Sequence, residues 1–211
     1  MKLLGIFGTS GFARDVNDVA NELGYRTVYI GQDQAEIDTW TSPGDVMLER
    51  DAGRHADMLF AIGIGENAVR QKVAQRFGEK LHFVNLIHPS ASFGKGQFDG
   101  IGSRKGVIVC AGVRFANNIL VGDFTIFNLN ATIGHDAIVD DYVNVSPGAN
   151  ISGNVHIGTR CWVGTGAAVN QGTGGSKLII GADTVIGSGS VVVKDCEPNA
   201  VYVGIPAKRI R

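Results

Sequence analysis

The carboxyl-terminal half of the chain carries an apolar residue at every sixth position. The repeat runs unbroken through eleven residues: Val109, Phe115, Val121, Phe127, Ile133, Val139, Val145, Ile151, Ile157, Val163 and Val169. The residue after each of these is small or polar, and the fourth residue after each is compact and mostly apolar. Each hexad therefore predicts one strand of roughly four to five residues and one bend, with the small or polar residue at the corner. Such a strand cannot bury its own face, so the pattern predicts a solenoid whose coils stack at about 4.8 Å, the spacing of paired strands.

The regions that flank this unbroken run depart from its register. Eleven residues rather than twelve separate Val169 from Ile180, which predicts that residues 171–177 leave the solenoid as a loop. The repeat then resumes at three positions: Ile180, Ile186 and Val192. Upstream, an earlier apolar pair is followed by the glycine-rich segment 94–106, which predicts a first coil with an outward loop.

The amino-terminal half has the pattern of a Rossmann-like βαβ unit. Residues 2–7 form an apolar run, a helical pattern ends at Gly24, and residues 27–30 form a second strand pattern. A third strand is predicted at residues 58–62 and a further helix at 67–77. The sequence therefore predicts a small α/β domain over residues 1–84, followed by an all-β domain over residues 85–211.

Two glycine turns follow strands of the first domain. Gly8 and Gly11 bracket the turn after the first strand, and Gly63 begins the turn after the third. Backbone N–H groups at such a turn, together with the positive end of a helix, make a seat for phosphate, and both turns are expected at one crevice. NAD is disfavoured because the G-x-G-x-x-G pattern is incomplete and no acidic residue follows the second strand before Asp33. An alternative to phosphate binding is that these glycines are needed only for the tight turns.

Composition excludes several partner classes. The chain has 211 residues, 44% of them apolar, and its 19 basic and 20 acidic residues form no basic run, which argues against nucleic acid. No signal-peptide pattern and no apolar stretch of about 18 residues is present, so a cytoplasmic protein without membrane insertion is expected. The three cysteines make no disulfide framework; Cys161 falls on an inward position as core, and Cys110 and Cys196 have no evident basic partner.

Six motifs extend over both halves of the chain. They are GTSG (8–11), AIG (61–63) with Asn67 and Arg70, VNLIHP (84–89), IGHD (133–136), SPGA (146–149) and VGIPAKR (203–209). With these motifs the chain resembles the nucleotide-sugar acetyltransferases of the PglD/NeuD type, within the hexapeptide-repeat acyltransferases. The resemblance implies a left-handed parallel β-helix of three hexads per coil, a homotrimer, acetyl-CoA as co-substrate and a UDP-linked 4-amino-4,6-dideoxy sugar as acceptor, in bacterial glycan biosynthesis.

The same resemblance points to His135 as the general base. An imidazole titrates near neutral pH, and the carboxylate of the adjacent Asp136 favours its productive tautomer and the imidazolium that develops. The amine of the sugar is expected to attack the thioester directly, with the backbone N–H of Gly153, eighteen residues further on, as donor to the oxyanion. Asn128 matches a family position near the reacting group, although asparagine also suits hexad corners.

The resemblance also implies two sets of binding residues. Acetyl-CoA is expected along the later coils, at Asn144, Gly164, Thr165, Gly187, Ser188 and Lys208. The UDP part is expected at Ser10, Gly11, Phe12, Asp33 and Gly63. Relatives commonly carry histidine where this chain has Phe12 and Asn144, and an acidic residue where it has Gln32, which puts the sugar and the pyrophosphate contacts in question.

Three alternatives remain. The first is acetylation of a hydroxyl on a sialic acid or another sugar, and the second is a nucleotide-sugar-binding scaffold without turnover. The third, a metal centre, needs three converging imidazoles, whereas the coils offer His135 and His156, twenty-one residues apart on different hexad positions. No metal is therefore expected.

Overall fold

The amino-terminal part of the chain forms a parallel α/β sheet. The computed structural model describes residues 2–55, 57–173 and 175–211, so Met1 and Ala56 of the predicted first domain and Gly174 of the predicted loop lie outside the described residues. The elements follow one another as β1 (Leu3–Phe7), α1 (Gly11–Glu22), β2 (Arg26–Gly31), α2 (Gln34–Asp38), β3 (Val46–Leu48), α3 (Glu49–Ala52), β4 (Leu59–Ile62), α4 (Asn67–Phe77) and β5 (His82–Phe83). The predicted βαβ unit is confirmed, whereas the short elements α2, β3 and α3 were not predicted.

The sheet has the strand order β3-β2-β1-β4-β5. The chain first adds strands outward from β1 through β2 to β3, and then returns to the other side of β1 with β4. Helix α1 packs on one face of the sheet, while α3 and α4 pack on the other face. The order reverses between β1 and β4, which is where open α/β sheets leave a crevice at the carboxyl ends of their strands.

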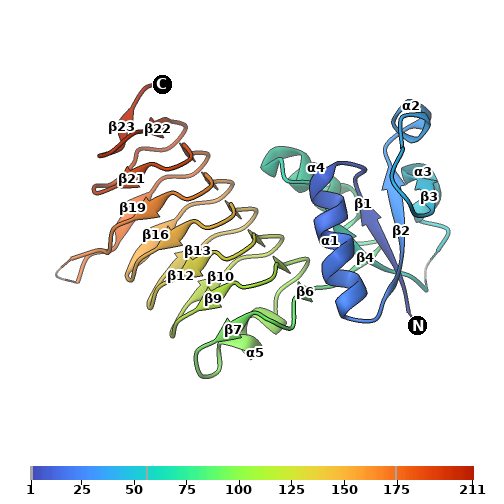
Figure 1. Cartoon of the computed structure of the whole chain (residues 1–211), viewed down its shortest axis with the longest axis horizontal. Coiled ribbons are helices and arrows are strands. Elements are labelled where there is room, and N and C mark those ends of the chain that lie inside the picture. Colours follow the sequence, from blue (N-terminus) through green and yellow to red (C-terminus); the bar gives the residue numbers. More distant parts are fainter. Residues whose placement is uncertain (1, 56, 174) are drawn as a thin grey trace.

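The rest of the chain is a left-handed parallel β-helix with three faces (Figure 1). Face 1 contains β6 (Leu86–Ile87), β8 (Ile108–Val109), β11 (Ile126–Phe127), β14 (Asn144–Val145), β17 (Trp162–Val163), β20 (Val185–Ile186), β22 (Val201–Val203) and β23 (Lys208–Arg209). Face 2 contains β7 (Ser92–Phe93), β9 (Arg114–Phe115), β12 (Thr132–Ile133), β15 (Asn150–Ile151), β18 (Ala168–Val169) and β21 (Val191–Val192). Face 3 contains β10 (Leu120–Val121), β13 (Ile138–Val139), β16 (Val155–Ile157) and β19 (Leu178–Ile180).

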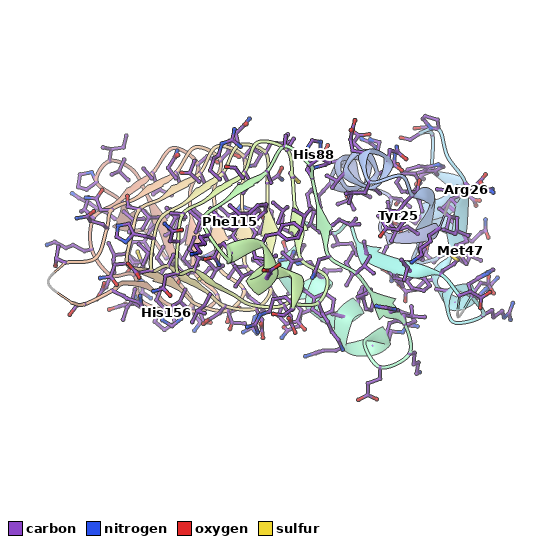
Figure 2. The ribbon with its side chains drawn as sticks, turned by 90° about the horizontal axis from the view of Figure 1, so that it is seen from below. Tyr25, Arg26, Met47, His88, Phe115 and His156 are labelled. Atoms are coloured by element: carbon purple, nitrogen blue, oxygen red, sulfur yellow. The ribbon has the colours of Figure 1, made fainter. Side chains whose placement is uncertain are left out.

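The predicted apolar column is confirmed as the core of the β-helix. All eleven hexad residues from Val109 to Val169 are buried, and Ile180, Ile186 and Val192 continue the column. Figure 2 shows Phe115 inside the coils and His156 at their outer edge. The predicted loop at residues 171–177 lies between β18 and β19, but the segment 94–106 contains the helix α5 (Gln97–Gly102) rather than only a loop.

The corners differ from the predicted geometry. Each strand is two or three residues long rather than four or five, and the bend comes later than the residue that follows the column position. The third residue after the column position takes a left-handed conformation, as at Asn118, Asn130, Asp136 and Asn154. Asparagine, aspartate and glycine tolerate this conformation better than other residues, which explains why they recur at this position.

The amino-terminal domain covers the first coils of face 1. Leu86, Ile108 and Ile126 point outward from this face and are fully buried in one cluster with residues of α1. The strands change from the α/β sheet to the β-helix between β5 and β6. The predicted domain division after residue 84 stays a prediction.

Arg70 of α4 makes a second contact between the amino-terminal domain and the β-helix. Its side chain is 1% exposed, and burial lowers its pKa to about 9. The guanidinium donates to the carbonyl oxygens of Ile64 and Gly65 beside the crevice and to those of Phe124 and Tyr142 on the β-helix, at 2.7–3.0 Å. One buried cation therefore ties the turn after β4 to the corner between faces 3 and 1.

We expect Arg70→Met to lower the free energy of unfolding by at least about 2 kcal/mol, because several buried carbonyl oxygens lose their donor. Urea titration followed by circular dichroism measures this loss. Arg50, whose side chain is 78% exposed, provides the control, and Arg50→Met should change the same free energy by less than about 0.5 kcal/mol. Equal effects of the two substitutions would contradict a clamp at Arg70.

Candidate active site

His135 and Asp136 lie together at the corner between faces 2 and 3. The Nδ1 atom of His135 is 2.7 Å from Oδ2 of Asp136. Since a carboxylate only accepts hydrogen bonds, Nδ1 is the donor, and in the neutral ring Nε2 then carries the lone pair. Asp136 has a φ of 59°, and this left-handed backbone turns its carboxylate back toward the preceding imidazole.

Asn118, one coil earlier at the same corner, supports the carboxylate. Its Nδ2 atom donates to Oδ1 of Asp136 at 2.6 Å. This hydrogen bond, followed by the one from His135, holds the pKa of Asp136 below its ordinary value. The carboxylate therefore stays ionised beside the imidazole, with Asn118 on one oxygen and His135 on the other.

Gly153 lies directly under the imidazole ring, one coil later. A Cβ atom on Gly153 would be 2.5 Å from both Cε1 and Nε2 of His135, so only glycine leaves room for the ring. The N–H of Gly153 donates no hydrogen bond to any described residue. The structure thus brings together three of the four predicted catalytic residues and leaves a backbone donor next to Nε2.

Lys177 completes this corner and was not predicted. It returns from the loop after β18, and its ammonium donates to the carbonyl oxygen of Asp136 at 2.5 Å and to Oδ1 of Asn154 at 3.1 Å. The lysine contacts the backbone of Asp136 rather than its carboxylate. The change of register between Val169 and Ile180 is the sequence signal for this inserted loop, but it does not show where the loop folds back.

Asn128 and four of the predicted acetyl-CoA residues occupy a different corner, between faces 1 and 2. They follow strands β11, β17 and β20 of face 1: Asn128, Gly164, Thr165, Gly187 and Ser188. Successive coils are joined there by backbone hydrogen bonds, such as that from Gly189 N–H to the Thr165 carbonyl at 2.8 Å. The Thr165 and Ser188 side chains are exposed. This corner is separated from His135 by the strands of face 2, so one chain does not bring the two groups together.

The other two predicted acetyl-CoA residues lie apart from this corner. Asn144 points outward from face 1 but is 4% exposed, and its Nδ2 donates to the carbonyl oxygen of Gly65 at 3.2 Å. Its Oδ1 is buried without a partner among the described residues. Lys208 is exposed on β23 at the last coil, and the neighbouring Arg209 pairs with Glu197.

Some of the residues predicted to bind the nucleotide line the crevice, and the others lie in the structure around it. Ser10 lines a cavity at the carboxyl ends of β1 and β2, and Gly11 begins the helix that follows. Gly63 lies against the first turn of α1, since a Cβ there would be 2.7 Å from Cα of Ala13. Asp33 instead caps α2 by accepting from the N–H of Glu36 at 2.9 Å, and Phe12 packs against the cluster between α1 and face 1.

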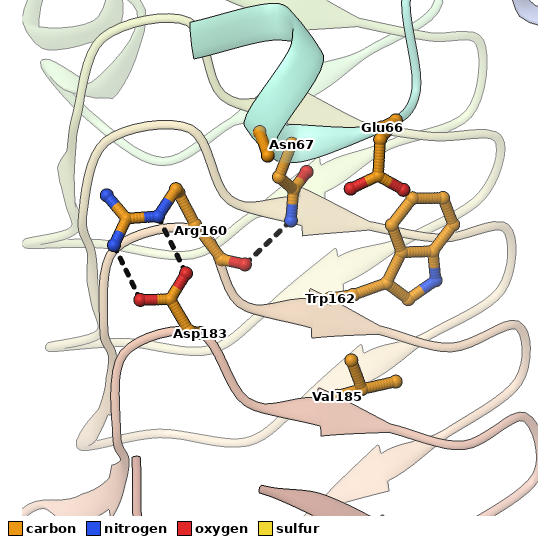
Figure 3. Close-up of a pocket in the computed structure, with 7 residues that line it drawn as sticks. Glu66, Asn67, Arg160, Trp162, Asp183 and Val185 are labelled. Atoms are coloured by element: carbon orange, nitrogen blue, oxygen red, sulfur yellow. Dashed lines mark hydrogen bonds and ion pairs between the residues drawn. The ribbon is translucent and has the colours of Figure 1, made fainter. Parts of the chain in front are cut away.

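A second cavity lies beside the start of α4, over face 1 (Figure 3). Trp162 and Val185 form its apolar wall, and Glu66 faces it from the turn before α4. On the opposite side Arg160 donates to both carboxylate oxygens of Asp183, and its carbonyl oxygen accepts from Asn67 at 2.8 Å. None of these residues was predicted to line a cavity.

Other chemistry is limited by burial and spacing. The cysteines are buried, and burial raises the pKa of both the Cys110 and the Cys161 thiol to about 12.

His156 lies on face 3, where its Nε2 is 3.1 Å from Asp140, and not beside His135. Over residues 2–55, 57–173 and 175–211 no group of three or more histidine, cysteine and acidic side chains is arranged to hold a metal ion. Within the same residues, none of the helices is both long enough and apolar enough to cross a bilayer.

Known proteins match this chain in each of its parts. Residues 3–77 match the family model of the PglD N-terminal domain. A UDP-N-acetylbacillosamine N-acetyltransferase of Bacillus subtilis (strain 168) is 46% identical over 48 residues, a segment that covers 22% of this chain and 22% of that protein. WeeI from Acinetobacter baumannii AYE has the same fold over 100% of both chains, with a TM-score of 0.88 and 26% identity. The chain thus carries a PglD N-terminal domain, and over its whole length it is similar to solved structures such as WeeI.

Two further solved structures that are similar to this chain contain ligands. PerB from Caulobacter crescentus, in complex with CoA and GDP-perosamine, is 27% identical with a TM-score of 0.85, over 100% of this chain and 98% of that chain. The acetyltransferase domain of PglB from Neisseria gonorrhoeae FA1090, in complex with acetyl coenzyme A, is 25% identical with a TM-score of 0.85, over 99% of both chains. The predicted fold class, an α/β domain followed by a left-handed β-helix, is thereby confirmed over the length of the chain.

We expect Asn118→Ala to raise the pKa of Asp136 toward its ordinary value, because the first of its hydrogen bonds is lost. The depressed pKa stabilises the folded chain above the ordinary carboxyl pKa, and this stabilisation disappears as the pH falls through the folded-state value. Carbon-detected NMR titration of the Asp136 carboxyl measures the shift. Asn150→Ala, at a position bonded to Thr132 on face 2, is the control and should leave that pKa unchanged.

Proposed function

We propose that the chain transfers an acetyl group from acetyl-CoA to the 4-amine of a nucleotide-linked 4-amino-4,6-dideoxy sugar. The observation that carries this proposal is the Asp136–His135 pair over the free N–H of Gly153. A base with a free lone pair and a donor for an oxyanion, side by side, suit attack of an amine on a thioester. The domain match and the sugar N-acetyltransferases among the similar proteins support the substrate class.

In this mechanism the amine nitrogen attacks the thioester carbonyl carbon directly. Nε2 of His135 accepts the proton that the amine loses, and the N–H of Gly153 stabilises the tetrahedral oxyanion. The C–S bond then breaks, the amide forms, and the thiolate of CoA takes up the proton held on Nε2 of His135. Asp136 holds the ring and stabilises the imidazolium, while Asn118 keeps that carboxylate in place.

We further propose that the site is completed by a second copy of the chain in a homotrimer. His135 and Gly153 lie at one end of the face 2 strands, whereas Thr165 and Ser188 lie at the other end. A three-fold assembly with face 2 turned toward its axis brings the first corner of one chain against the second corner of the next. Acetyl-CoA would then run along the glycine-flanked corner of Thr165 and Ser188, and reach His135 of the neighbour.

The amino-terminal domain, residues 1–84 in our division, would hold the nucleotide. Ser10 and the glycine turns at the β1/β4 switch point support this assignment, because backbone N–H groups there suit phosphate. The resemblance of the sequence suggested UDP as the nucleotide. The cytoplasmic location also stays a prediction.

We expect His135→Ala to reduce turnover at least about a hundredfold, because the general base is lost. Release of the CoA thiol in the presence of acetyl-CoA and a panel of UDP- and GDP-linked 4-amino sugars measures the rate. Hydroxyl acceptors and CMP-sialic acid belong to the same panel, and release with these alone would favour O-acetylation. His156→Ala, on the outer surface of face 3, is the matched control and should keep the wild-type rate. An unchanged rate for His135→Ala would refute its role.

A mixing experiment tests whether two chains share the site. Both His135→Ala and the double variant Thr165→Trp/Ser188→Trp should be inactive alone. Co-refolding them in equal amounts should restore about a quarter of the wild-type activity, because one interface in four pairs two intact corners in a random trimer. Mixtures that stay inactive would place both corners of the site in one chain and contradict the shared arrangement.

A further inference from the structure

The crevice of the amino-terminal domain is acidic, which a seat for pyrophosphate alone does not explain. Its cavity is lined by the glycine turn after β1, by apolar side chains of α4 and by two carboxylates, Glu36 and Glu49. No lysine or arginine is among the described residues that line it. Two carboxylates repel phosphate and accept hydrogen bonds, so the part of a ligand that fits here is neutral and rich in N–H and O–H donors.

Glu36 provides the acidic group that the sequence appeared to lack after β2. Its Oε2 accepts from the backbone N–H of Gln32 at 2.6 Å, and its Oε1 accepts from the hydroxyl of Thr9. These bonds hold the carboxylate between the end of β2 and the glycine turn, although Glu36 comes four residues after Gln32. In dinucleotide-binding folds a carboxylate at this place binds the ribose hydroxyls. Asp33, which is closer in sequence, is turned away as the cap of α2.

Glu49 follows β3 and is more deeply buried. It is 7% exposed, and burial raises its pKa. Arg76 pairs with its Oε1, while its Oε2 accepts no hydrogen bond from the described residues. Glu49 lines the cavity together with the apolar side chains of Val69 and Val73, so the cavity offers both a carboxylate and an apolar surface suited to a flat ring. Oε1 can still accept a second hydrogen bond.

We propose that this cavity holds a guanosine, with Glu49 on the base edge and Glu36 on the ribose hydroxyls. The inference rests on the proposed function and specifies its acceptor as a GDP-linked amino sugar. Guanine presents two adjacent N–H donors, at N1 and N2, that match the two oxygens of a carboxylate. Uracil presents one N–H between two carbonyl oxygens, which a carboxylate repels, and adenine and cytosine place an acceptor nitrogen beside their amine.

Binding of the free nucleotides to the full-length protein tests this specificity without any acetyl transfer. By isothermal titration calorimetry, GDP should bind at least about tenfold more tightly than UDP, because a buried group that hydrogen-bonds the right ligand is left unpaired by the wrong one. Equal affinities, tighter binding of UDP, or no binding of either nucleotide overturns the proposal.

The Glu49→Gln variant separates recognition of the base from support of the fold. Its amide offers one acceptor and one donor, which suit N3–H and a carbonyl oxygen of uracil, so GDP should weaken at least about tenfold and the GDP-to-UDP affinity ratio should fall. A purely structural carboxylate would weaken both nucleotides alike and keep the ratio. Glu22→Gln, an exposed glutamate at the end of α1, makes the same charge change as a control and should keep both affinities.

Glu36 is tested through the ribose. The wild type should bind 2′,3′-dideoxy-GDP at least about tenfold more weakly than GDP, and Glu36→Ala should reduce this difference to less than about threefold. A difference that persists in Glu36→Ala overturns the ribose contact. These outcomes can be told apart from failure of the proposed function. If the protein binds UDP more tightly than GDP and releases the CoA thiol with a UDP-linked amino sugar, the guanosine proposal is wrong while the proposed acetyl transfer still stands.

Discussion

Parallel pairing between successive coils, whose paired residues are eighteen positions apart within residues 108–169, holds the β-helix together and places the groups at its corners. The backbone of each coil donates to the coil that follows, and the apolar column fills the space between the three faces. Within residues 108–169 a residue therefore lies over the one eighteen positions later, as Asn118 lies over Asp136. Inserted segments lengthen this spacing outside that range, as between Val163 and Ile186. Such stacking leaves little freedom for backbone or side chain, so a corner can hold a carboxylate, an imidazole and a bare N–H in fixed relation.

The rigid β-helix cannot bring two of its corners together within one chain, which limits a site that needs both. The corners of a prism cannot approach each other across a face, because strands of paired backbone separate them. A second copy of the chain can supply the missing corner without any deformation. The His135 side chain is 63% exposed in the single chain, which agrees with a site that a second copy of the chain completes.

The amino-terminal domain is held on the β-helix by apolar contacts, by the buried guanidinium of Arg70, and by hydrogen bonds from the Asn67 and Asn144 amides. Arg70 has no carboxylate partner among the described residues, and carbonyl oxygens from both parts of the chain take that place. The guanidinium also donates to Oδ1 of Asn67 at 2.7 Å. A buried cation bonded to neutral dipoles is sensitive to small displacements, because hydrogen bonds weaken steeply with distance and angle. The orientation of the crevice relative to the coils is therefore well defined. Under the proposed function, the acidic lining of that crevice selects the part of a nucleotide that enters it.

The sequence by itself determined the elements that repeat or that depend on local pattern. The hexad register from Val109 to Val169 predicted which side chains form the column, and the helix at residues 67–77 was predicted at its observed bounds. The spacing of eighteen residues also predicted that His135 and Gly153 lie together, because in a solenoid distance along the chain converts directly into position.

Tertiary structure alone decided the contacts between segments without a common period. Gln32 and Asp33 follow β2 in the sequence, yet the carboxylate that lines the crevice beside the end of β2 is that of Glu36, since a turn of helix brings it back over Gln32. Lys177, Arg70 and Glu49 reach their partners across loops and between domains. No local pattern encodes such contacts, because they depend on how separately formed elements pack against each other.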